Sequence, residues 1–173
     1  MLRRWGLPIL VGIVIAALAW QGALLAVPRG LMSLAEGRLI ALRGYNQMGF
    51  GEFVTAGTRQ VVRPSPDLLY SSCTFDLAQG PVLIDAEPVD APYWSLSVFD
   101  HLTNVVFVRN NQQSGGQAVR VAIVRDGQSA PSGYQPVHIG GRRGVALMRI
   151  LIDRTKPIDT LDQQRRRSSC RPA

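Results

Sequence analysis

The sequence has few metal-binding side chains: two histidines and two cysteines among 173 residues. His101 follows Asp100 directly, His138 is distant, and no paired-cysteine or His-Glu-x-x-His spacing occurs. Because zinc sites need clustered ligands, the sequence argues against a zinc protein. Scattered aspartates suit calcium chemically, but no loop has the required ligand spacing. No metal site is expected.

Nucleophile and phosphate motifs are also missing. No Gly-x-Ser-x-Gly turn is present to expose a serine, although Cys73, Ser71 or Ser72 could pair with a histidine base. Residues 49–51, Gly-Phe-Gly, are too short for a phosphate loop and follow a helical pattern rather than a strand. The sequence therefore indicates a non-catalytic protein, and no cofactor is expected.

Lysine is nearly absent, since 18 of the 19 basic residues are arginine. The formal net charge is +7, but most of the excess lies at the two ends of the chain. Between residues 30 and 155, 11 arginines face 10 carboxylates. A nearly neutral domain has no strong field for attracting phosphates, which argues against a nucleic-acid partner.

The sequence does contain one long apolar run, Leu7–Val27, whose 21 residues carry no charge. A helix of this length spans about 30 Å, the thickness of a bilayer's hydrocarbon core. Arg3 and Arg4 precede it and favour a cytoplasmic N-terminus. The alternative is a signal peptide cleaved near residues 17–19, but apolarity continues past that point. We expect a single-pass inner-membrane protein with a periplasmic domain.

The next segment, residues 31–47, has helical periodicity and predicts a short amphipathic helix leaving the membrane. The expected organisation is then an anchor at 1–29, this helix and a linker at 30–59, an exported domain at 60–155 and a basic tail at 156–173. The apolar stripe of the helix consists of Leu31, Leu34, Ala35, Leu39 and Leu42.

From residue 60 onward the apolar residues alternate with a period of two, which is typical of strands. Turn residues such as Gly, Pro, Asn and Asp separate the runs at intervals of about ten residues. This pattern predicts a mainly β domain, an antiparallel sandwich or jelly-roll-like fold. The run from 104 to 109 is the one expected to be buried most fully. The predicted strands are 69–75, 81–86, 94–98, 104–109, 118–124 and 145–152.

Cys73 and Cys170 are the two thiols, and an exported domain lies in an oxidising compartment. We therefore expect a disulfide, which closes a loop of nearly a hundred residues and stabilises by about 4 to 5 kcal/mol in the chain-entropy model. The alternative is a buried Cys73 and a free Cys170.

The segment after Thr155 loses apolarity and has two interpretations. A frayed polar tail is the favoured one. Alternatively, residues 157–167 form a short helix with Leu161 inward and with Arg165, Arg166 and Arg167 either solvated or near lipid. Anionic headgroups attract such arginines by about 1 kcal/mol each.

A candidate ligand site comes from the stretch Val61–Leu77. Pro64 and Pro66 restrict the backbone and pre-position Asp67 and Tyr70 at the start of a strand. Ser71 adjoins them, and Asp100 is the acid considered with them for a carbohydrate cleft. The aromatic residues nearby are interpreted by default as core packing. Asp67 is interpreted by default as a cap for nearby backbone amides.

These residues also carry a resemblance. Residues 64–71, Pro-Ser-Pro-Asp-Leu-Leu-Tyr-Ser, followed by Asp76-Leu77 and Gly80-Pro81, resemble the family catalogued as domain of unknown function 1254. Its usual motif reads Pro-Asn-x-Asp-Thr-Leu-Tyr-Ser, then Asp-Leu and Gly-Pro. Residues 93–104 are similar to its next strand pair, and the likeness spans about residues 35–155.

The resemblance implies a β-rich, sandwich-like envelope domain, often partnered with a domain of unknown function numbered 1214. This chain looks like the short membrane-anchored form without that partner domain. Asp67, Tyr70 and Ser71 match the motif, whereas Ser65 and Leu68 replace its asparagine and threonine and make the segment less polar. No reaction follows from the resemblance.

Together these patterns predict a membrane-anchored envelope protein whose exported β-domain serves interaction or assembly, with a companion protein of the partner family as its expected partner. The alternative is a carbohydrate-directed enzyme or binding module using a cleft near Asp67, Tyr70 and Asp100.

Overall fold

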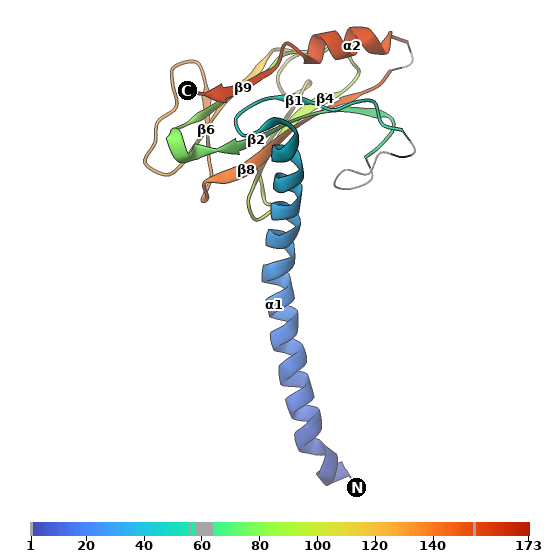
Figure 1. Cartoon of the computed structure of the whole chain (residues 1–173), viewed down its shortest axis with the longest axis vertical. Coiled ribbons are helices and arrows are strands. Elements are labelled where there is room, and N and C mark those ends of the chain that lie inside the picture. The colour runs from blue at the N-terminus through green and yellow to red at the C-terminus, as the bar shows by residue number, and fades with distance from the viewer. Residues whose placement is uncertain (1, 56, 58–63, 154) are drawn as a thin grey trace.

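The computed structural model describes residues 2–55, 57, 64–153 and 155–173. Residues 61–63, the beginning of the proline-containing stretch singled out above, lie outside this range. A long helix projects from a compact β-domain, and the N-terminus lies at the far end of that helix (Figure 1).

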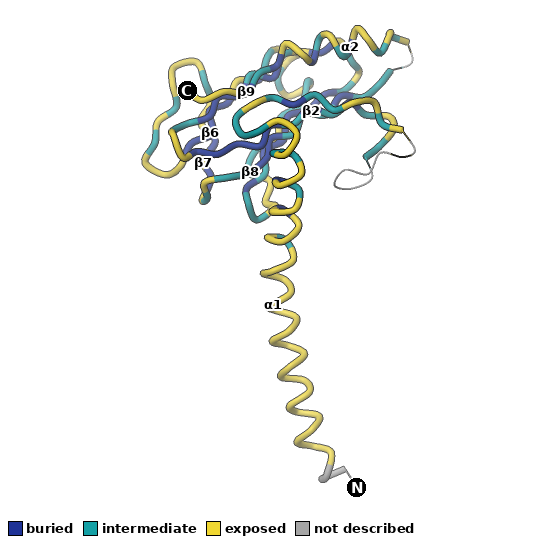
Figure 2. The backbone as a smooth tube through the Cα atoms, in the orientation of Figure 1, coloured by how far each residue is buried: buried dark blue, intermediate teal, exposed yellow. Residues whose placement is uncertain are grey.

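Helix α1 (Leu2–Arg43) has 42 residues, about 63 Å at 1.5 Å per residue and roughly twice the hydrocarbon thickness of a bilayer. The expected span Leu7–Val27 lies within it and is exposed throughout (Figure 2). The helix continues through Pro28, whose missing N–H leaves a carbonyl of the preceding turn without its helical partner. A single helix therefore replaces the two separate helices expected.

The expected apolar stripe of α1 faces the domain only in part, since Ala35 and Leu39 are half-buried. Leu31, Leu34 and Leu42 are 59%, 50% and 63% exposed, whereas Met32 and Glu36 are only 7% and 8% exposed. Residues four apart share one helix face, so Met32 and Glu36 define the face that packs against the domain. The predicted helical periodicity was correct, but apolar residues occur on more than one side of the helix. Which side is buried depends on how the helix packs against the domain.

In the part of the chain that the structure describes, nine strands form two sheets, and together they make a sandwich. Sheet A has the order β1-β2-β8-β4-β5 and sheet B the order β7-β6-β3-β9. Neighbouring strands are antiparallel except the parallel pair β6–β7. The predicted fold class and all six predicted strands are confirmed. The strands are β1 (Gly49–Phe50), β2 (Leu68–Asp76), β3 (Val82–Ala86), β4 (Trp94–Asp100), β5 (Val105–Asn110), β6 (Val119–Val124), β7 (Gln135–His138), β8 (Arg143–Leu151) and β9 (Ser169–Pro172).

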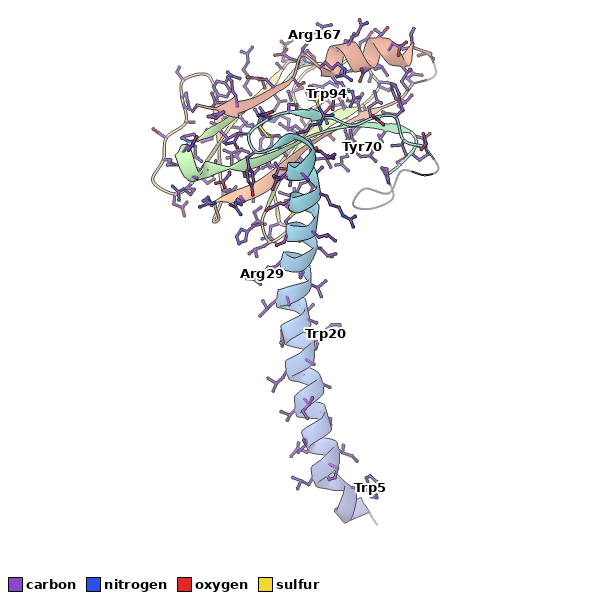
Figure 3. All side chains as sticks on the ribbon, viewed as in Figure 1. Trp5, Trp20, Arg29, Tyr70, Trp94 and Arg167 are labelled. Atoms are coloured by element: carbon purple, nitrogen blue, oxygen red, sulfur yellow. A yellow bond between two sulfur atoms is a disulfide. The ribbon has the colours of Figure 1, made fainter. Side chains whose placement is uncertain are left out.

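The core lies between the two sheets (Figure 2). Alternate residues of each strand point into it, as the period-two pattern requires. Trp94, Phe75 and Ile84 are buried almost completely, and Trp94 is labelled in Figure 3.

The predicted disulfide between Cys73 and Cys170 is present. Cys73 lies on β2 of sheet A and Cys170 on β9 of sheet B, so the bond joins the two layers through the core. Their Cα atoms are 6.3 Å apart, within the range that disulfides span.

The C-terminal segment belongs to the domain, so the favoured interpretation as a frayed polar tail is wrong. It contains helix α2 (Ile158–Arg165) and strand β9, which pairs with β3 in sheet B. Leu161 is completely buried and Cys170 nearly so. Two well-placed side chains anchor a segment whose average composition is polar.

Strand β5 is less buried than its sequence suggests. Val105 and Val108 are 55% and 48% exposed. Among the described strands β5 ends sheet A, and α1 packs elsewhere on that sheet. A continuous apolar run indicates burial on both faces, but no residue of this edge strand is fully buried, and only Val106 and Phe107 pack partly against the core.

Candidate functional site

The four predicted ligand residues do not form one site. The Asp67 carbonyl, at the start of β2, accepts a hydrogen bond from the Ile152 amide at 2.9 Å. Asp100 ends β4 opposite Gly144. Positions 144 and 152 are eight residues apart along β8, about 27 Å at 3.4 Å per residue. A cleft containing both carboxylates is therefore excluded.

Asp100 closes its own turn. Its carboxylate accepts hydrogen bonds from the Leu102 amide at 2.8 Å and from the Asn104 amide and side chain at 2.9 and 2.8 Å. Thr103 has a φ of 68°, a left-handed conformation that such side-chain bonds stabilise. Asp100 thus shapes the β4–β5 turn.

Tyr70 fixes the start of β2. Its hydroxyl accepts a hydrogen bond from the Ser65 amide at 3.0 Å, and the Ser65 hydroxyl accepts one from the Asp67 amide at 3.3 Å. The Asp67 carboxylate is exposed, and it caps no amide of the described residues. Ser71 is completely buried. The segment is organised as a strand start.

Arg165, predicted to face lipid, is only 1% exposed. Its guanidinium donates to the carbonyls of Tyr70 at 2.6 Å and Gly51 at 2.7 Å, and to the Asp162 carboxylate at 2.7 Å. The lipid-facing prediction is wrong for this residue, because two backbone carbonyls beside the short strand β1 accept its fork of donors. Arg165 joins α2 to sheet A.

The neighbouring arginines are exposed, but they do not lie beside the expected span. Arg166 donates to Asp162 at 2.7 Å and lies 5.3 Å from the Phe50 ring centre. Arg167 lies on the opposite side of the domain from the long stem of α1 (Figure 3). A bilayer crossed by Leu7–Val27 would therefore not contact this run of arginines.

A polar hollow of about 330 Å³ opens on sheet B around Asp85. Because Ile84 points into the core, Asp85 points outward from β3. Its carboxylate accepts hydrogen bonds from the Tyr134 hydroxyl at 2.9 Å, the Ser169 hydroxyl at 3.0 Å and the Arg171 guanidinium. This ring ties β9 and the segment before β7 to β3.

The hollow carries three guanidinium groups. The Arg120 Nε lies 3.7 Å from Asp85, and Arg171 donates to Asp85 and Tyr134. The guanidinium of Arg167 makes no hydrogen bond or ion pair with any described residue. Burial alone would raise the pKa of Asp85, but hydrogen bonds from Arg171, Tyr134 and Ser169 lower it below its usual value. Asp85 is therefore ionised and its charge is matched, while cationic donors remain at the rim.

The chemistry of this hollow suits the binding of an anion. Its described lining has three arginines, Arg120, Arg167 and Arg171, and two acids, Asp85 and Glu87. Half-exposed guanidinium groups suit a carboxylate or another oxyanion. Sequence analysis missed the site because Ser169 and Arg171 had been placed in a tail. One feature of the sequence could have indicated the site: Asp85 and Arg120 carry opposite charges and both interrupt apolar strand patterns. In the structure they are paired across β3 and β6.

The contact between α1 and the domain contains a second set of charged groups. Glu36 is buried, and its Oε1 has no hydrogen-bond partner among the described residues. Desolvation raises its pKa, while the charges of Arg143 and His101 oppose the rise and that of Asp76 adds to it. Asp76 itself binds Arg142 and Arg143, at 2.9 and 2.8 Å.

Substituting Glu36→Gln is expected to strengthen this contact at neutral pH, by an amount on the order of 1 kcal/mol, because glutamine carries no charge to desolvate. Since the pKa of Glu36 is raised in the folded protein, its carboxyl stabilises fully below its ordinary pKa. That stabilisation is lost as pH rises through the folded-state pKa. The advantage of the glutamine variant should therefore grow between pH 4.5 and 8 in thermal unfolding.

Glu52→Gln is the matched control, because Glu52 is exposed and close in sequence to α1. It should unfold as the wild type does at every pH. A Glu36→Gln variant with a pH-independent difference from wild type would contradict the assignment of Glu36 as a desolvated carboxyl.

Comparison with known proteins identifies the family. The family described as "Protein of unknown function (DUF1254)" matches residues 45–172. The chain belongs to this family. The match confirms the resemblance seen in residues 64–81, and it includes α2 and β9, which sequence analysis had excluded from the domain.

Two solved structures resemble this DUF1254 protein. A crystal structure from Vibrio parahaemolyticus has 14% identity and a TM-score of 0.64, covering 87% of this chain and 37% of its own. An uncharacterized protein from Burkholderia cenocepacia has 16% identity and a TM-score of 0.48, covering 73% and 34% respectively. The Vibrio structure supports the fold, and the chain spans little more than a third of that protein. No curated protein matches the chain.

Proposed function

We propose that this protein is a single-pass protein of the bacterial inner membrane, with its N-terminus in the cytoplasm and its β-domain in the periplasm. The domain serves as a docking module for a companion envelope protein, and a member of the family numbered 1214 is the expected companion. The anchor is supported by one helix, Trp5–Arg43, that is long and apolar enough to cross a membrane. A retained anchor rather than a signal sequence is part of the proposal.

The observation that carries the docking role is the orientation of the hollow around Asp85. α1 packs against sheet A, through β2 and the charged groups near Asp76. The hollow opens on the outer face of sheet B, the other layer of the sandwich. A tethered domain of this kind presents its arginines away from the bilayer, where acidic groups of a partner can reach them.

Arg167→Glu is expected to weaken binding of the companion about tenfold, because it places a negative charge at a rim that favours carboxylates. The Arg167 side chain bonds to no described residue, so the domain should keep its stability. The measurement is recovery of the companion by the tagged full-length protein from solubilised membranes, with the companion identified by mass.

Arg125→Glu is the control, since Arg125 is exposed and lies outside the hollow. Equal recovery with both variants would remove the hollow from the proposal, and recovery of a bare monomer in all cases would refute the docking role. Intact mass of the purified chain tests whether residues 7–27 are retained.

A further inference from the structure

The domain begins close to the end of the expected span. Met32 is buried against the domain only five residues after Val27. Five residues of helix rise about 7.5 Å. Each polar headgroup layer of a bilayer is about 5 to 7 Å thick, the difference between a bilayer of 40–45 Å and a core of 30 Å. The lower part of the domain therefore meets the headgroup layer.

Apolar side chains of α1 remain uncovered at this height. Leu31 and Leu34 are exposed. Leu31 lies about 6 Å beyond Val27 along the helix axis, within the headgroup layer, and Leu34 about 10 Å beyond it, just outside that layer. Helical side chains lean toward the N-terminus, so both lean back toward the bilayer. Side chains of this type are stabilised when they enter the boundary between headgroups and acyl chains.

The β4–β5 turn lies beside the same part of the helix. His101 in this turn is close enough to Glu36 to influence its charge. The turn also touches the segment before β8, since a Cβ at Gly141 would lie 2.3 Å from the His101 ring. Figure 1 shows the domain reaching down beside α1 on the side of the expected bilayer.

The charge on this side is suited to anionic lipid. Asp76 is bound by Arg142 and Arg143, and Asp100 by the amides of its own turn. Three guanidinium groups, those of Arg29, Arg142 and Arg143, thus stand against the carboxylates of Asp76 and Asp100 at the foot of the domain. The third acid here, Glu36, is buried and its pKa is raised. Anionic headgroups attract such groups over distances within a Debye length.

We propose that a stem-side surface, formed by Arg29, Leu31, Leu34, the turn 101–104 and Arg142, rests on the anionic headgroups of the bilayer that α1 crosses. This inference rests on the proposed anchor. The proposed surface is a different set of lipid-contacting residues from the Arg165–Arg167 run predicted from the sequence. It also implies that sheet A, against which α1 packs, is the layer nearer the membrane.

The test uses full-length protein in nanodiscs, with single fluorophores at Leu34→Cys, Thr103→Cys or Ser132→Cys. The native cysteines are joined in the disulfide, so they do not compete for the label. Ser132 lines the hollow on sheet B and is the control. With headgroup-attached quenchers, the labels at 34 and 103 should be quenched severalfold more than the label at 132. Quenching at 103 should increase in phosphatidylglycerol relative to phosphatidylcholine, and added salt should reverse the increase.

Equal quenching at positions 103 and 132, or no dependence on lipid charge, would overturn the proposal. Energy transfer between Leu34→Cys labels of two molecules in one disc would do so as well, since it would show that a second copy covers the stem. Intact mass separates these outcomes from failure of the anchor: a chain lacking residues 7–27 refutes the proposed membrane topology, and the inference with it.

Discussion

Replacing Cys73 and Cys170 together by alanine is expected to lower the free energy of unfolding by about 4 to 5 kcal/mol. The disulfide closes a sequence separation of 97 residues, and the chain-entropy model gives this magnitude for a loop of that size. Because a domain of this kind is stable by about 5 to 15 kcal/mol in total, the variant loses a large fraction of its stability. Urea unfolding followed by Trp94 fluorescence measures the change.

Two controls make this expectation specific to the cross-link. Reducing the wild-type disulfide without any substitution should reproduce the loss, which separates it from the small cavity that alanine leaves. The dependence of stability on urea should also become steeper, because the unfolded chain is no longer held compact. Reduced and oxidised protein with the same unfolding midpoint would contradict the stabilising role of the bond.

The sequence was sufficient for the fold because its local patterns agree with one another. Period-two alternation and turn residues located six strands, and an even cysteine count in a chain expected to be exported predicted the disulfide. These properties depend on residues near one another or on chemistry independent of geometry. The family was recognisable for a related reason, since residues 64–71 form one continuous motif.

Predictions failed where a distant part of the chain decides the environment. Arg165 belongs to a basic run and would be expected in solvent, but carbonyls at residues 51 and 70 accept its hydrogen bonds. Val105 and Val108 would be expected in the core, but their strand is at the edge of a sheet. Composition describes a segment and does not specify what packs against it.

The candidate site was missed for the same reason. Asp85, Tyr134 and Arg171 are far apart in sequence and meet only when β9 pairs with β3. Asp67 and Asp100 both follow or precede turn signals, yet β8 separates them by nearly its full length. The order of strands in the sheets determines both the meeting of Asp85 with Arg171 and the separation of Asp67 from Asp100. Sequence patterns do not specify that order.

Arg165→Ala is expected to destabilise the domain by about 1 to 3 kcal/mol, the usual cost of leaving a buried hydrogen-bonding group without its partner. The Gly51 carbonyl loses the guanidinium as its donor. The Tyr70 carbonyl and the Asp162 carboxylate each lose one of two donors, because the Gly51 amide and Arg166 remain. The adjacent Arg167→Ala is a matched control from the same run of arginines. It should change stability by no more than about 0.5 kcal/mol, since Arg167 is exposed and unpaired among the described residues.

The pH dependence distinguishes the ion pair from simple packing. Burial would raise the pKa of Asp162, but hydrogen bonds from Arg166 and Arg165 outweigh it and lower the pKa below 3.8. Asp162 therefore stabilises the folded state above its ordinary pKa, and this contribution is lost as pH falls through the lower folded-state value. The stability difference between wild type and Arg165→Ala should shrink on acidification below about pH 4. An equal difference at pH 3 and pH 7 would assign the role of Arg165 to its volume and its bonds to the carbonyls, and not to its charge pairing with Asp162.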